Sequence, residues 1–77
     1  MIEQAVKDLV CSVLKLPPDQ YSEDLAAGDV PAWDSLGQVN LVMALEQTFD
    51  LMIEVEDFEQ LKSVPAILAY LDRQGVR

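Results

Sequence analysis

The chain is 77 residues long, and 51% of its residues are hydrophobic, while five basic and 14 acidic side chains give a net charge of −9. This length predicts one domain, residues 1–77, without a separate catalytic lobe, and the hydrophobic content is too high for a disordered segment. Nucleic acids and anionic membranes would repel such a charge, so basic protein surfaces are the better partners, although charge also simply keeps a small domain soluble.

The first predicted element is an amphipathic helix from about Ile2 to Leu16. Its apolar residues recur at the spacing of one helix face: Ile2, Ala5, Val6, Leu9, Val10, Val13 and Leu14. Pro17 disfavours helical backbone at the residue before it and so ends the helix. Cys11 lies about half a turn from the centre of the apolar stripe, which indicates an exposed thiol without a reactive role.

A long loop is predicted next, from Pro17 to Asp34, because this segment has neither helical nor strand periodicity. Loops longer than about 12 to 15 residues are uncommon in compact domains, and they usually either serve a function or indicate a wrong assignment of the elements. Tyr21 and Leu25 are the residues expected to hold this loop against the core.

A second helix is predicted from Ser35 to about Phe49, and it is apolar on two sides. One side carries Leu41, Val42, Leu45 and Phe49, and the roughly opposite side carries Leu36, Val39 and Met43. One stripe should face the core and the other solvent. An exposed stripe that starts at Ser35 and has Glu46 and Asp50 at its rim would suit docking of partner proteins. A central helix buried on all sides would explain the same pattern.

Two more helical segments are predicted after Ile53. Val55, Phe58 and Leu61 recur at three-residue spacing, which indicates a short helical turn. The last helix begins at Ser63, which suits an N-cap, and Pro65 is tolerated in its first turn. Its core residues are Ile67, Leu68 and Leu71, and Gly75 suits its end. No segment has the pattern of a strand.

Ser35 is expected where the long loop meets the second helix, exposed at the positive end of a helix dipole. Unpaired backbone N–H groups at such an end favour a phosphate bonded to the hydroxyl. A purely structural role is the alternative. Either Asp34 or Ser35 would serve as the N-cap, and Ser35 with Gln38 has the spacing of a capping box.

Together these segments resemble the acyl carrier protein family. Asp34-Ser35-Leu36 matches the attachment motif of that family, and the family's spacing continues through Val39, Leu41 to Glu46, Phe49-Asp50 and Ile53. Ser63-Val64 and Ile67 match the start of the family's last helix, so the resemblance runs through the whole chain.

The resemblance implies an all-α fold, a four-helix bundle of three longer helices and one short helix with a long loop between helices one and two. It implies that a phosphopantetheinyl transferase moves 4′-phosphopantetheine from coenzyme A to Ser35, with Asp34 contributing to recognition. The protein would then be a carrier and not an enzyme. It would shuttle acyl thioesters between acyl-loading and acyl-accepting enzymes, whose basic surfaces would dock on Leu36, Val39, Met43, Glu46 and Asp50.

Several positions depart from the carriers of primary fatty acid synthesis. Gly37, Asn40 and Gln47 stand where those carriers usually have acidic residues, and Leu51-Met52 is more apolar than usual. Trp33 and Gly37 on either side of the motif resemble stand-alone carriers of specialised pathways, such as polyketide, extender-unit or aminoacyl systems.

The sequence argues against several other functional classes. Histidine is absent and Cys11 is the only cysteine, which excludes Cys–His catalysis and Cys/His zinc sites. The acidic group Glu54, Glu56, Asp57 and Glu59 lacks the pattern of a calcium-binding EF-hand and is interpreted as a solvated face. No membrane span or signal peptide is predicted, so we expect a cytoplasmic protein. We also expect it to be a monomer. A helical interaction module without a prosthetic group is the alternative function.

Overall fold

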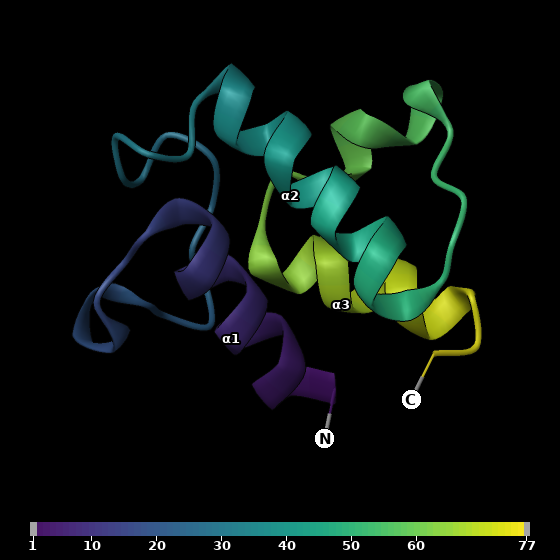
Figure 1. The fold of residues 1–77 in the computed structure, drawn as a ribbon, viewed down its shortest axis with the longest axis horizontal. Helices are drawn as coiled ribbons and strands as arrows, with labels where there is room; N and C mark the ends of the chain where they lie inside the picture. The colour runs from purple at the N-terminus through teal and green to yellow at the C-terminus, as the bar shows by residue number, and fades with distance from the viewer. Residues whose placement is uncertain (1, 77) are drawn as a thin grey trace.

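The computed structural model describes residues 2–76, and among them it contains helices and no strand. The α-helices are α1 (Ile2–Leu14), α2 (Ser35–Phe49) and α3 (Val64–Arg73), and the 3₁₀ helices are η1 (Pro18–Gln20) and η2 (Val55–Leu61) (Figure 1). The predicted all-α fold with three longer helices and one short helix is confirmed, and η1 is an additional turn within the long loop. The bounds of α2 are those predicted.

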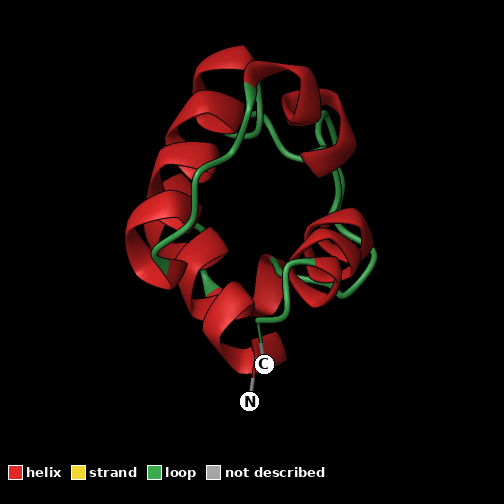
Figure 2. Cartoon of the chain, turned by 90° about the vertical axis from the view of Figure 1, so that its right-hand side faces the viewer, coloured by secondary structure: helices red, strands yellow, loops and turns green. Residues whose placement is uncertain are grey.

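The helices enclose one hydrophobic core. α2 contacts both α1 and η2, and α3 contacts α1 and η2. The side chains that are fully buried come from all four of these elements and from the loop: Val6, Val10, Trp33, Leu41, Val42, Leu45, Leu61, Val64, Ile67 and Leu71. Figure 2 shows the helical segments joined by loops alone. The start of α1 and the end of α3 lie at one end of the molecule in both views, and α2 starts at the opposite end in Figure 1.

α1 ends two residues earlier than predicted. Lys15 adopts left-handed backbone with φ of 56°, and the Leu16 N–H donates a hydrogen bond to the Cys11 carbonyl at 2.9 Å. This is a common way of closing a helix C-terminus, and it acts before the restriction imposed by Pro17. The prediction that Cys11 is exposed was wrong: the side chain is half-buried and packs against the core, because the buried face of α1 is wider than its apolar stripe.

The long loop is ordered because both its side chains and its backbone are paired with the rest of the fold. Leu25 is buried and Tyr21 half-buried, as predicted. In addition, the Ala27 N–H donates to the Lys62 carbonyl at 2.7 Å, and the Val64 N–H donates to the Leu25 carbonyl at 2.8 Å. The loop is thereby fixed beside the segment that joins η2 to α3.

α3 begins and ends as the sequence indicates. The Ser63 hydroxyl oxygen accepts a hydrogen bond from the Ala66 N–H at 3.1 Å, so Ser63 is the N-cap, and Pro65 lies in the first turn. Gly75 has φ of 80° just beyond the helix. Of the predicted core residues, Ile67 and Leu71 are fully buried and Leu68 is half-buried.

Candidate functional site

Ser35 is the first residue of α2, and its side chain is exposed. The helix is capped by the preceding residue: Asp34 Oδ1 accepts from the Gly37 N–H at 2.9 Å, and the Asp34 carbonyl accepts from the Gln38 N–H at 2.9 Å. Of the two structural alternatives, Asp34 is therefore the N-cap and Ser35 is not. The Ser35 hydroxyl is left available at the positive end of α2, where a phosphate is electrostatically favoured.

The capping box that pairs Ser35 with Gln38 does not form, because Gln38 is buried and has other partners. Its Oε1 accepts from the Trp33 indole N–H at 2.7 Å, and its Nε2 donates to the carbonyls of Phe58 at 3.1 Å and Leu61 at 3.0 Å. The Gln38 side-chain amide thus joins the loop, α2 and η2 by hydrogen bonds close to Ser35. The sequence did not predict this structural role of Trp33 and Gln38.

Gly37 is buried, and the Ala32 carbonyl oxygen occupies the place where a Cβ would lie. The Leu14 Cδ2 atom is 3.1 Å from the same position. A glycine is needed here because the loop backbone approaches the helix so closely. Packing therefore gives a reason for glycine at this position that is independent of any biosynthetic pathway.

We expect Gly37→Ala to destabilise the fold by about 1 to 3 kcal/mol, because the new methyl group forces the Ala32 backbone away from α2. Denaturant unfolding would measure the loss. Asn40→Ala is the matched control, since Asn40 is exposed on the same helix, and it should change stability by no more than about 0.5 kcal/mol. Equal stability of Gly37→Ala and the wild type would contradict the close approach.

A hollow of about 450 Å³ opens beside Ser35, between the loop, the first turns of α2 and η2. This volume is within the roughly 300 to 1,000 Å³ typical of small-molecule sites. Its lining combines aromatic and apolar walls with a few charged groups: Ala27, Gly28, Trp33, Asp34, Ser35, Gln38, Val39, Phe58, Glu59 and Lys62. We call it the Ser35 pocket.

The two apolar stripes of α2 face in the directions predicted. Leu36, Val39 and Met43 are exposed by 69%, 41% and 52% of their surface. On the other side Leu41, Val42 and Leu45 are buried, and Phe49 is half-buried. The alternative of a helix buried on all sides was wrong, and α2 presents an apolar surface that begins next to Ser35.

The two acidic residues expected at the rim of this surface differ in whether the carboxylate is already hydrogen-bonded within the fold. Glu46 is half-buried, and its Oε2 accepts from the Ile53 N–H at 2.9 Å, so it holds the segment after α2. Asp50 is exposed and caps the end of α2 in left-handed backbone with φ of 56°. Asp50 is therefore the freer of the two carboxylates.

Two of the acidic residues around η2, Asp57 and Glu59, have side-chain partners. Glu59 pairs with Lys62 at 2.7 Å, and Asp57 accepts from the Tyr70 hydroxyl at 3.5 Å. Burial raises the pKa of Tyr70 above its ordinary value, and the neighbouring Asp57 carboxylate raises it further. Within residues 2–76, no three His, Cys, Asp or Glu side chains lie close enough together to hold a metal ion.

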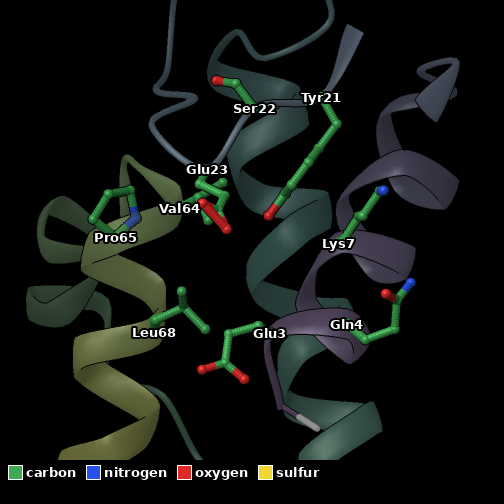
Figure 3. A pocket seen from close by; sticks show the side chains of 9 residues that line it. All are labelled: Glu3, Gln4, Lys7, Tyr21, Ser22, Glu23, Val64, Pro65 and Leu68. Atoms are coloured by element: carbon green, nitrogen blue, oxygen red, sulfur yellow. The ribbon is translucent and has the colours of Figure 1, made fainter. Parts of the chain in front are cut away.

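A second hollow, of about 570 Å³, lies between α1, α3 and the loop and shares no residue with the Ser35 pocket (Figure 3). Tyr21 extends into it between Lys7 and Glu23, and the Lys7 ammonium lies 5.8 Å from the centre of the Tyr21 ring. Burial raises the pKa of Tyr21, and Cys11 and Glu23 add to the effect. This hollow includes the start of α3, but the serine at that helix end, Ser63, uses its hydroxyl as the N-cap. The candidate site is therefore at the start of α2, where the Ser35 hydroxyl is free of the cap.

No helix in the described part of the chain is both long enough and apolar enough to cross a membrane.

Comparisons with known proteins match nearly the whole chain. The family model described as a phosphopantetheine attachment site matches residues 4–71. An acyl carrier protein of Bdellovibrio bacteriovorus is 40% identical over 74 residues, which cover 96% of this chain and 95% of the relative. An acyl carrier protein of Akkermansia muciniphila is 33% identical over 72 residues, which cover 94% of this chain and 90% of the relative.

Proposed function

Because this chain belongs to the acyl carrier protein family, with its phosphopantetheine attachment site, we propose that Ser35 is the residue that bears the 4′-phosphopantetheine arm. As a member of that family the chain is a carrier and not an enzyme. When bound, the arm supplies a thiol on which an acyl group is held as a thioester. The interaction module without a prosthetic group is thereby set aside.

One observation carries the assignment to Ser35: its exposed hydroxyl is at the positive end of α2 while Asp34 provides the cap. The chain has three other serines. Ser12 lies within α1 and Ser22 in the loop, and the Ser63 hydroxyl is used as the N-cap of α3. Only Ser35 combines accessibility with a helix end that favours a phosphodiester.

The surroundings of Ser35 suit a residue that must accept the arm and then hold it in a constant position. The Asp34 cap and the Gln38 hydrogen bonds fix the first turn of α2 against the loop and η2. The arm therefore swings from a rigid base, and its flexible length lets a bound acyl group reach several active sites at high effective concentration. We assign Asp34 an added role in recognition by the transferase.

Members of this family interact with modifying and biosynthetic enzymes. We propose that phosphopantetheinyl transferase and the acyl-loading and acyl-accepting enzymes dock through basic surfaces on Leu36, Val39, Met43, Glu46 and Asp50. Asp50 supports this assignment, because a carboxylate at the negative end of a helix is electrostatically unfavourable for the helix. The free carboxylate is thus better explained by a partner than by the fold.

The remaining expectations complete the proposal. The chain would act as one domain over residues 1–77, as a monomer in the cytoplasm, and in a specialised pathway. The pathway proposal now rests on Asn40, Gln47 and Leu51-Met52, since packing accounts for Gly37 and for the buried, hydrogen-bonded Trp33.

Incubation with coenzyme A and a broad-specificity phosphopantetheinyl transferase tests the function. We expect intact mass to rise by one phosphopantetheine group per chain. The rate should fall severalfold as salt increases from about 0.01 to 0.15 M, because the Debye length drops from about 30 to 8 Å and screens attraction between opposite charges. An unmodified chain would contradict the carrier function, and a salt-independent rate would contradict docking through charge.

A further inference from the structure

The Ser35 pocket contains a single cationic side chain, that of Lys62. In the sequence, Lys62 is also the only basic residue between Lys15 and Arg73, in a chain whose net charge is −9. A phosphodiester formed on Ser35 adds a further negative charge to the same pocket. Lys62 is therefore the one side chain there that can neutralise it directly.

The Lys62 side chain is free to turn toward a new partner while its backbone stays fixed. The Lys62 carbonyl accepts from the Ala27 N–H at 2.7 Å, which holds the main chain to the loop. The ammonium pairs with Glu59 at 2.7 Å, but the two side chains are 50% and 78% exposed. Exposed ion pairs of this kind contribute little stability, so Glu59 holds Lys62 only weakly.

We propose that Lys62 binds the phosphate of the arm, an inference that rests on attachment at Ser35. Once Ser35 is modified, the Lys62 ammonium exchanges Glu59 for the phosphodiester, whose charge lies beside the Ser35 oxygen. A lysine suits this role because its compact charge and flexible stem bind phosphate without strict geometry. The positive end of α2 also favours the phosphate.

Two carboxylates in the pocket oppose this arrangement, and they differ in effect. Asp34 directs Oδ1 to the Gly37 N–H, so part of its charge is already compensated. Glu59 competes directly with the phosphate for Lys62. Removal of Glu59 should therefore strengthen the contact, and removal of Lys62 should weaken it.

Phosphate binding at Lys62 would direct the first part of the arm into the Ser35 pocket. Its aromatic and apolar walls, formed by Trp33, Val39 and Phe58, would then contact the apolar part of the arm. The arm would rest along η2 between visits to partner enzymes instead of extending freely into water.

Nuclear magnetic resonance of the phosphopantetheinylated protein tests the inference without any measurement of carrier activity. The first readout is the ³¹P chemical shift of the phosphodiester during a salt titration from about 0.01 to 1 M. The second is the change in chemical shift of the Gly28 and Phe58 amides between the unmodified and the modified protein. In the wild type we expect the ³¹P shift to change with salt and both amides to move on modification.

Lys62→Gln should lose the salt-dependent ³¹P change and most of the two amide shifts, and Glu59→Gln should enlarge the amide shifts. Lys15→Gln removes one positive charge outside the pocket and should match the wild type. Lys62→Arg keeps the positive charge, so it should retain the ³¹P and amide changes and controls for altered folding. Wild-type behaviour of Lys62→Gln, or loss of the effect in Lys62→Arg, would overturn the inference. A wild-type chain that gains no mass would instead refute attachment itself.

Discussion

Ser35→Ala is expected to abolish attachment of the phosphopantetheine arm, because it removes the oxygen on which the phosphodiester forms. The fold should be nearly unaffected. Asp34, and not Ser35, caps α2, and the Ser35 side chain is exposed. The loss of stability should therefore stay within about 0.5 kcal/mol, as for other surface substitutions. Intact mass after transferase treatment and denaturant unfolding measure the two effects.

Ser22→Ala is the matched control, because Ser22 is also an exposed serine but lies in the loop and outside the Ser35 pocket. This variant should gain the mass of one arm, as the wild type does. Modification of Ser35→Ala to the wild-type extent would exclude Ser35 as the attachment residue.

Leu45→Ala should destabilise the protein by about 2 to 5 kcal/mol, whereas Met43→Ala should change its stability by no more than about 0.5 kcal/mol. The two residues are on the same helix and differ in the face they occupy. Leu45 is fully buried, and Met43 is 52% exposed. Urea unfolding of both variants gives the comparison directly, since each loses a side chain of similar size.

Met43→Ala should instead slow phosphopantetheine transfer or acyl loading, because Met43 belongs to the exposed stripe proposed to dock partners. Methionine suits a surface that must fit several enzymes, since its side chain is flexible and polarisable. A strongly destabilised Met43→Ala together with a nearly neutral Leu45→Ala would mean that the two faces of α2 are reversed.

Helical periodicity was sufficient to predict the bounds of α2, the direction of its two stripes and the core face of α3. These features depend on residues three or four positions apart, so the local pattern contains the information. The end of α1 was less accurate, because the left-handed turn at Lys15 is made by a residue type with no particular preference for it.

The parts of the site that depend on contacts distant in the sequence were not predicted. Gln38 reaches the carbonyls of Phe58 and Leu61, about twenty residues away, and Trp33 is buried although the loop before it has no periodic pattern. Gly37 is required by the Ala32 backbone, which approaches only once the loop has folded back. No local spacing encodes these approaches, whereas the attachment motif was recognisable from its neighbours along the chain.

The placement of the chain ends bears on how the protein can be handled. α1 begins and α3 ends at one end of the molecule, and α2 begins at the other (Figure 1). A bead, chip or fluorescent fusion joined through either end would therefore stand away from Ser35. Such a tethered carrier would keep Ser35 accessible, so attachment of the arm could be followed on an immobilised sample.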